Sequence, residues 1–227
     1  MDNFALIRTF WRSRRSKVPP KLLQNQAGYT LLELLVTLGL LTAIVAIAAP
    51  SWLGFVQQRR VNAAKDAVLR ALQDAQSKAK TQKLSYSVSF RTQNRVPEVA
   101  VYPGSATTPP NNSWKQLGDQ LSLQPGQIWI GTNVAPTQSN TATGSVNTID
   151  QNGVKVVTFD NSGALPTTIN TNLGTQGLII AVGAALRNST PPQAIASTRR
   201  CVKISTLLGS IQTGKLDSTG AACNLIQ

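Results

Sequence analysis

The chain has 227 residues, and its 22 Lys and Arg against 9 Asp and Glu give a net charge of +13 at pH 7 without any histidine. The lack of imidazole excludes histidine general bases, Ser-His-Asp and Cys-His nucleophile systems, and histidine-containing zinc sites. Only 14% of the residues are charged, against roughly 25% in an average soluble domain, so the polar surface is mostly uncharged. We therefore expect that the protein is not an enzyme and that it has no catalytic residues, metal site or cofactor.

A basic leader precedes one long apolar run. Residues 1–28 hold six Lys or Arg and one acid, Asp2, for a net charge of +5. The run over residues 29–49 contains one charge, Glu33, and as a helix it would be about 31 Å long, enough to cross a hydrocarbon core of ~30 Å. The positive-inside rule then leaves the basic leader in the cytoplasm and exports the C-terminal part. An ordinary secretory signal cut near residues 46–48 is the alternative, which Glu33 and the long basic segment disfavour.

Glu33 is the unusual residue of this run. A carboxylate inside an apolar membrane segment is costly unless it is paired, and it indicates a functional site. No Lys or Arg lies between Lys21 and Arg59, so no basic side chain is within a helical turn of Glu33. Cleavage after Gly28 would create a new amine on Tyr29, about one turn away, and a neighbouring copy would offer the same group. We therefore expect a terminal amine to be the partner of Glu33.

The ten residues AGYTLLELLV, residues 27–36, closely resemble the class III signal of type IV pilins and type II secretion pseudopilins. The resemblance implies cleavage of the Gly28–Tyr29 bond by a prepilin peptidase and methylation of the new Tyr29 amine, although family members more often begin with Phe or Met. It also implies that Glu33 neutralises the terminal amine of an adjacent subunit during filament assembly. The implied partners are other pilin or pseudopilin subunits, the peptidase, the inner-membrane assembly platform and the lipid bilayer.

The helix is predicted to continue over residues 50–83 as an amphipathic half. Pro50 removes a backbone hydrogen bond, so a kink is expected there. Beyond it, small and branched apolar residues recur at a helical period and define one face, while Arg and Lys lie outside that face. The apolar positions are Val61, Ala64, Val68, Leu72, Ala75 and Ala79.

The period changes after Lys83, where Leu84, Tyr86, Val88 and Phe90 alternate with serines and predict a half-buried strand. Asp160–Gly163 is typical of a turn, whereas a calcium loop would need more acids. Residues 103–112 and 132–152 are polar and nearly uncharged, so we expect exposed loops there. Further strands are predicted at Val96–Tyr102, Gln127–Ile130, Val154–Phe159, Leu178–Val182 and Cys201–Ile204. The fold class is therefore α+β, a long N-terminal helix packed on a small antiparallel β-sheet head spanning residues 84–227.

Two cysteines, Cys201 and Cys223, lie near the C-terminus without metal-binding spacing. An exported head favours a disulfide that holds the tail, and two free buried thiols are the alternative.

The segments SYSVSF, VVTFDNSGALP and RRCVKISTLLGSI occur in an order similar to that of the GspH/FimT-like subgroup of minor pseudopilins. Some relatives bind DNA, and Arg199, Arg200 and Lys203 form a candidate patch. However, the arginine motif of those relatives is not matched after Gly209. The preferred interpretation is a single-pass inner-membrane protein with an exported head, a minor subunit of a type IV pilus or type II secretion pseudopilus. A DNA-binding minor pilin and a secreted β-domain are the alternatives.

Overall fold

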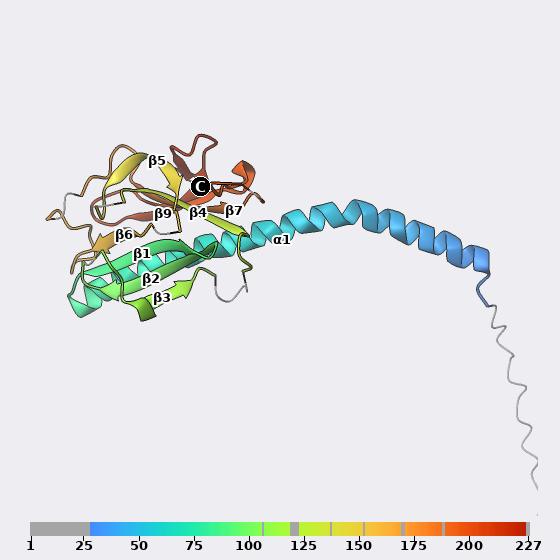
Figure 1. Ribbon diagram of the computed structural model, residues 1–227, viewed down its shortest axis with the longest axis horizontal. Helices are drawn as coiled ribbons and strands as arrows, with labels where there is room; N and C mark the ends of the chain where they lie inside the picture. Colours follow the sequence, from blue (N-terminus) through green and yellow to red (C-terminus); the bar gives the residue numbers. More distant parts are fainter. Residues whose placement is uncertain are drawn as a thin grey trace, which may run out of the picture. The chain divides into compact units, whose positions relative to one another are not determined.

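The computed structural model describes residues 28–105, 107–118, 123–136, 138–151, 153–168, 171–187 and 189–225, without the side chains of residues 48–51. The basic leader therefore lies outside the described residues, apart from Gly28. The chain divides into two compact units, Met1–Ile47 and Ala48–Gln227, and one helix contributes to both (Figure 1).

Helix α1 runs over Leu31–Gln82, 52 residues. Its first turn is capped by Thr30, whose Oγ1 accepts a hydrogen bond from the backbone N–H of Glu33 at 3.2 Å. The helix is continuous through Pro50. The kink expected at Pro50 stays a prediction. It ends before Lys83, whose φ of 56° reverses the chain direction.

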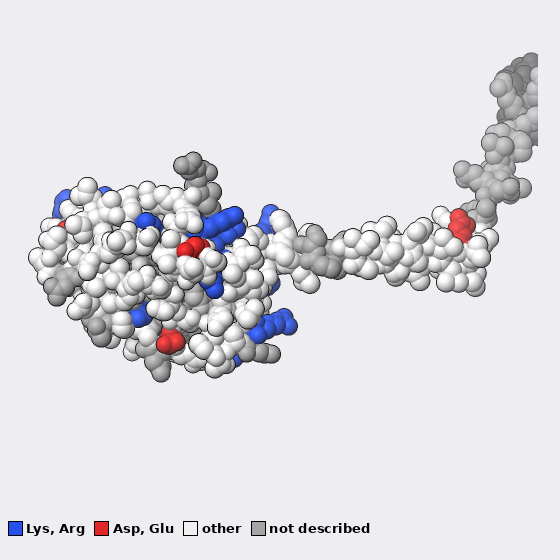
Figure 2. Space-filling view, turned by 90° about the horizontal axis from the view of Figure 1, so that it is seen from above, with Lys and Arg blue, Asp and Glu red and all other residues white. Residues whose placement is uncertain are grey.

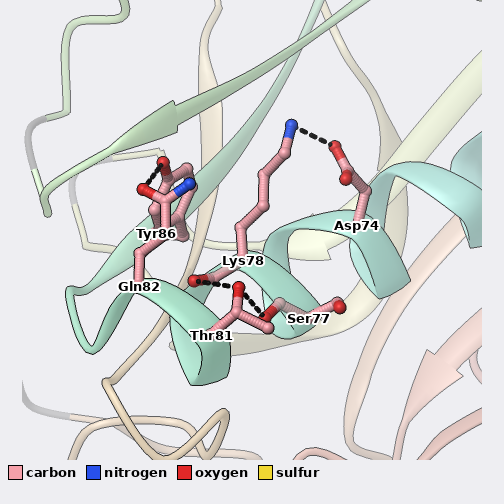
Figure 3. A network of polar contacts seen from close by, with 6 residues as sticks. All are labelled: Asp74, Ser77, Lys78, Thr81, Gln82 and Tyr86. Atoms are coloured by element: carbon pink, nitrogen blue, oxygen red, sulfur yellow. Dashed lines mark hydrogen bonds and ion pairs between the residues drawn. The ribbon is translucent and has the colours of Figure 1, made fainter.

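The amphipathic half of α1 is confirmed, because its six predicted apolar positions from Val61 to Ala79 are all fully buried. Polar contacts cluster where this half ends (Figure 3). Lys78 pairs with Asp74 at 2.8 Å, and the Tyr86 hydroxyl donates to Gln82 Oε1 at 2.7 Å. The second contact joins the last turn of the helix to the first strand of the head.

The head contains two antiparallel sheets, so the predicted α+β class is confirmed and the sheet region is larger than expected. The first sheet has the order β3-β2-β1-β6 and the second has the order β10-β9-β8-β7-β4-β5. In the part of the chain that the structure describes, 3₁₀ helices at Asn111–Ser113 and Ala196–Thr198 precede β3 and β8. The strands are β1 Tyr86–Gln93, β2 Val96–Pro103, β3 Trp114–Gln116, β4 Ile128–Val134, β5 Ala142–Thr148, β6 Lys155–Phe159, β7 Leu178–Ala184, β8 Arg200–Ile204, β9 Ile211–Leu216 and β10 Cys223–Leu225.

One hydrophobic core joins the helix to both sheets. The buried face of α1 belongs to the same cluster as Phe90 and Phe159 of the first sheet and Ile130 and Ile180 of the second. Figure 1 shows β1 and β2 lying along the C-terminal part of α1. The helix therefore supplies apolar surface to two sheets at once, which explains why its buried face is so complete.

The prediction of a half-buried first strand was wrong. Leu84 is exposed and precedes β1, whereas Ser87 and Ser89 are fully buried. Ser87 Oγ donates to the Gly104 carbonyl oxygen at 2.7 Å, and Ser89 Oγ lies 2.8 Å from the Tyr102 hydroxyl. Because these hydroxyls have hydrogen-bond partners, β1 is buried on both faces without the free-energy cost of unsatisfied polar groups.

The prediction of a loop over residues 132–152 was also wrong, although much of β5 is exposed as expected. This segment holds the end of β4 and all of β5, and Asn133 and Asn140 are almost fully buried. Their side-chain amides form hydrogen bonds with backbone groups, in the place of a neighbouring strand. A polar segment without alternating apolar residues is therefore part of the sheets. Strands β3, β9 and β10 had no prediction. The turn at Asp160–Gly163 is confirmed, with Asp160 Oδ1 accepting from the Ser162 backbone N–H at 2.9 Å.

Candidate functional site

The residues of the predicted cleavage and methylation site lie at the start of α1. Tyr29 is 82% exposed, and a Cβ added at Gly28 would contact nothing within 4 Å. Glu33 is exposed, and it takes no part in the ion pairs of the described residues. The peptide bond after Gly28 is therefore accessible, and the Glu33 carboxylate is available to a partner.

The first part of α1 is apolar on every side. By length and composition it is apolar enough to cross a membrane, with a mean hydropathy of 2.5 over 18 residues. Figure 2 shows this part as uncharged surface apart from an acidic group near its N-terminal end. A helix that is hydrophobic all round needs lipid or other helices around it. Its exposed large side chains include Leu31, Leu32, Leu34, Leu35, Val36, Leu38, Leu40, Leu41, Ile44, Val45 and Ile47.

The C-terminal part of α1 is attached to the head through Gln76. Its side-chain Nε2 donates to the carbonyl oxygens of Gly163, at 2.8 Å, and Gly209, at 2.9 Å. Both glycines have φ near +77°, a conformation that favours glycine. A Cβ on Gly209 would lie 2.6 Å from Gln76 Nε2 and 2.7 Å from the Gly163 oxygen. One helix side chain thus forms hydrogen bonds with two turns of the head.

The predicted disulfide is present. Cys201 of β8 and Cys223 of β10 are bonded across 22 residues. They lie in a second hydrophobic cluster, which also contains Trp129 and Leu216. Gly214 of β9 pairs with Cys201, and a Cβ there would overlap the backbone carbonyl oxygen of Asn224 and lie 3.1 Å from Cys223 Sγ. The bridge therefore spans the intervening strand at a position where only glycine fits.

The candidate nucleic-acid residues are not gathered on one face. Arg200 and Lys203 lie in β8 at positions whose side chains point to opposite faces, because strand side chains alternate. The Arg199 guanidinium lies over Trp129, 5.9 Å from the ring centroid, and donates to the Ala194 carbonyl oxygen at 3.4 Å. Contact with nucleic acid at these residues stays a prediction.

Two acids of the head, Asp160 and Asp217, accept hydrogen bonds within turns. Burial opposes ionisation of Asp160, but hydrogen bonds from Ser162 and from the backbone N–H of Ala164 outweigh it and lower the pKa of this carboxyl. In Asp217 the hydrogen bond from Thr219 is the main cause of a lowered pKa. Within the described ranges, no three His, Cys, Asp or Glu side chains are grouped so that they would hold a metal ion.

The head contains a cavity of about 400 Å³ that was not predicted from the sequence. Trp129 and Leu186 line it together with the charged residues Arg95, Asp150 and Arg187. These residues come from separate segments that only the fold brings together. No motif or spacing in the sequence signals this cavity.

A family model, the prokaryotic N-terminal methylation motif, matches residues 23–49. This match covers the segment that resembles a class III signal, and it supports assignment to the type IV pilin and pseudopilin family. No curated protein and no solved structure matches the chain. The GspH/FimT-like subgroup therefore stays a prediction.

Proposed function

We propose that the chain is a minor pilin or pseudopilin, cleaved after Gly28, methylated on the Tyr29 amine and assembled into a type IV pilus or a type II secretion pseudopilus. The observation that carries the proposal is the placement of one carboxylate, Glu33, in the first turn of an apolar helix that matches the methylation motif. No basic side chain near it in sequence is able to neutralise it. A terminal amine is the cation that the proposed processing supplies.

The same helix explains how one subunit serves two environments. Before assembly, residues 29–49 anchor the precursor in the inner membrane, with the head exported and the basic leader in the cytoplasm. During assembly the apolar surface passes from lipid to the corresponding helices of neighbouring subunits. Pairing of Glu33 with a neighbour's Tyr29 amine removes the cost of two isolated charges in an apolar filament core.

The attachment of α1 to the head supports a structural role. The buried face from Val61 to Ala79 and the hydrogen bonds of Gln76 fix the second half of the helix to both sheets. A displacement of that half therefore carries the head with it. This property suits a subunit that is added to a filament through its N-terminal half.

Sequencing of the N-terminus of the processed protein tests the proposal. We expect the mature chain to begin at Tyr29 and to carry an added methyl group on its amine. A start near Ala49 would instead identify a secreted domain and overturn the proposal, and an uncut chain would indicate a simple anchor.

A Gly28→Val variant sharpens the experiment. A side chain at residue 28 meets no other atom within 4 Å, so its effect on folding is small. Loss of processing in this variant therefore reports recognition by the peptidase. The matched control is Gly54→Ala, which also adds a Cβ in open space and is expected to be processed normally.

A further inference from the structure

A short stretch of α1, residues 52–60, lies between the apolar run and the part of the helix that packs on the head. We call it the junction segment. Trp52, Leu53 and Phe55 are 66%, 69% and 50% exposed, whereas Val61 is fully buried. Within the described residues, full burial of the helix begins at Val61 and residues 56–58 are half-buried, whereas three large apolar side chains before them are exposed.

The junction segment has an ordered aromatic and cationic face. Trp52 and Phe55 are three residues apart, and their ring centroids are 6.1 Å apart. The Arg59 guanidinium carbon lies 4.8 Å from the centroid of the Phe55 ring. Because residues three and four apart are neighbours on a helix, the three side chains form one continuous stripe.

The charge of the junction segment is of one sign. No Asp or Glu occurs between Glu33 and Asp66, whereas Arg59, Arg60 and Lys65 do. Lys65 is paired with Asp66 at 2.9 Å. Arg59 and Arg60 take no part in the ion pairs of the described residues. The exposed Arg59 guanidinium, which lies over the Phe55 ring, is therefore available to anions, and the half-buried Arg60 adds a second positive charge next to it in the sequence.

We infer that the junction segment binds anionic phospholipid headgroups at the membrane surface from which the head emerges, an inference that rests on the membrane anchoring in the proposed function. Trp52 follows the end of the apolar run by three residues, about 4.5 Å of helix, which corresponds to the headgroup level. Trp is enriched at this level because its ring is apolar and its N–H is polar. Arg59 and Arg60 keep their charged groups beside lipid phosphates, while their aliphatic stems cover apolar surface.

Bromine-labelled lipids test the inference in the full chain. The protein is placed in vesicles of phosphatidylcholine and phosphatidylglycerol whose acyl chains carry bromine either near the headgroup or near the bilayer centre. Subtracting the emission of a Trp52→Phe chain isolates Trp52 from the other three tryptophans. We expect the Trp52 emission to be quenched more strongly by the shallow label than by the deep one.

The charge dependence is tested with two variants. Arg59→Gln is expected to weaken docking of the segment about fivefold in vesicles rich in phosphatidylglycerol, since one cation near an anionic surface contributes about that factor. In vesicles of phosphatidylcholine alone the variant and the parent should behave alike. Arg70→Gln, which removes an exposed cation farther along the helix, should leave the quenching unchanged.

Two results would overturn the inference. Absence of quenching by either label would leave the segment in water. A blue-shifted Trp52 emission that depends on the density of chains and not on brominated lipid would identify a second copy as the occupant. Extraction of the vesicles with alkaline carbonate separates failure of this inference from failure of the proposed function. A chain that stays in the membrane but shows unquenched Trp52 lacks only the binding of the junction segment. A chain that is released from the membrane lacks the anchor itself.

Discussion

The side-chain amide of Gln76 on α1 donates a hydrogen bond to the Gly209 carbonyl oxygen at 2.9 Å, across 133 residues of sequence. The same nitrogen donates to the Gly163 carbonyl oxygen at 2.8 Å. The two turns also bond to each other, because the Leu165 N–H donates to the Leu207 carbonyl oxygen at 2.7 Å. One helix residue therefore fixes the relative position of the helix and two turns.

Replacement of Gln76 by Ala should destabilise the head by about 1–3 kcal/mol, because two partly buried carbonyl oxygens lose their donor. Chemical denaturation monitored by circular dichroism measures this change. Gln73→Ala, at an exposed position on the same helix, is the control. Gly209→Ala should be destabilising as well, and its effect should add only in part to that of Gln76→Ala, because the contact of the new Cβ with Gln76 is shared whereas the backbone strain at positive φ is not. Full additivity would show that the contact is absent.

A Glu33→Ala variant should be cleaved normally and should enter filaments poorly. The N-terminal cap uses the backbone N–H of residue 33 and not its side chain, so the start of the helix is retained. What is lost is the carboxylate that neutralises an amine in an apolar filament core. N-terminal sequencing reports cleavage, and a pull-down of sheared filaments reports incorporation.

Glu33→Asp is the matched control for this variant, since it keeps the charge on a side chain one methylene shorter. It should be incorporated better than Glu33→Ala. Normal incorporation of Glu33→Ala would argue strongly against pairing of the two charges.

Asn133 should tolerate substitution poorly despite its position in a polar segment. It is 1% exposed, its Nδ2 donates to the Gly177 carbonyl oxygen at 2.8 Å, and its Oδ1 accepts from the Ile179 N–H at 2.7 Å. Asn133→Ala leaves both backbone groups without a partner, and we expect a loss of about 2–4 kcal/mol in the free energy of unfolding. Thermal melting compared with Asn147→Ala, an exposed position of β5, checks this. Equal melting temperatures for the two variants would refute the structural role of Asn133.

The Cys201–Cys223 bridge should hold β10 in the sheet. A double Cys201→Ala and Cys223→Ala variant should lose about 2–4 kcal/mol, the usual contribution of a disulfide. Amide exchange should rise most in Cys223–Leu225, a strand of three residues that pairs only with β9. In the parent chain, alkylation under denaturing conditions without reductant should label neither cysteine. Labelling of both would mean that the bridge does not form.

Acid should weaken the turn that Asp160 organises. Its pKa is lowered in the folded state, since hydrogen bonds to the charged carboxylate outweigh the opposing effect of burial. A depressed pKa contributes stability above the unfolded value, and this contribution is lost as pH falls through about 4 toward the folded value. Denaturation midpoints measured between about pH 6 and pH 2.5 should therefore fall less steeply for Asp160→Asn than for the parent. Identical slopes would show that Asp160 does not contribute.

The sequence alone was sufficient for the features that depend on local pattern. The apolar run with Glu33, the buried face from Val61 to Ala79 and the turn at Asp160–Gly163 are each encoded within a few residues of one another. A helical period of apolar residues or an Asx turn needs no distant partner to be recognised. The disulfide was also predictable, because the head was expected to be exported and an oxidising compartment favours pairing of two cysteines.

Tertiary structure decided the features that depend on partners far away in the sequence. Ser87, Ser89, Asn133 and Asn140 look like surface residues in the sequence, yet they are buried because strands and turns distant along the chain satisfy their hydrogen bonds. In the second sheet β4, β7 and β8 coincide with predicted strands, whereas β5, β9 and β10 were not predicted and are defined by the strands with which they pair. A one-dimensional pattern records the polarity of a residue, whereas its burial depends on whether the fold brings it a partner.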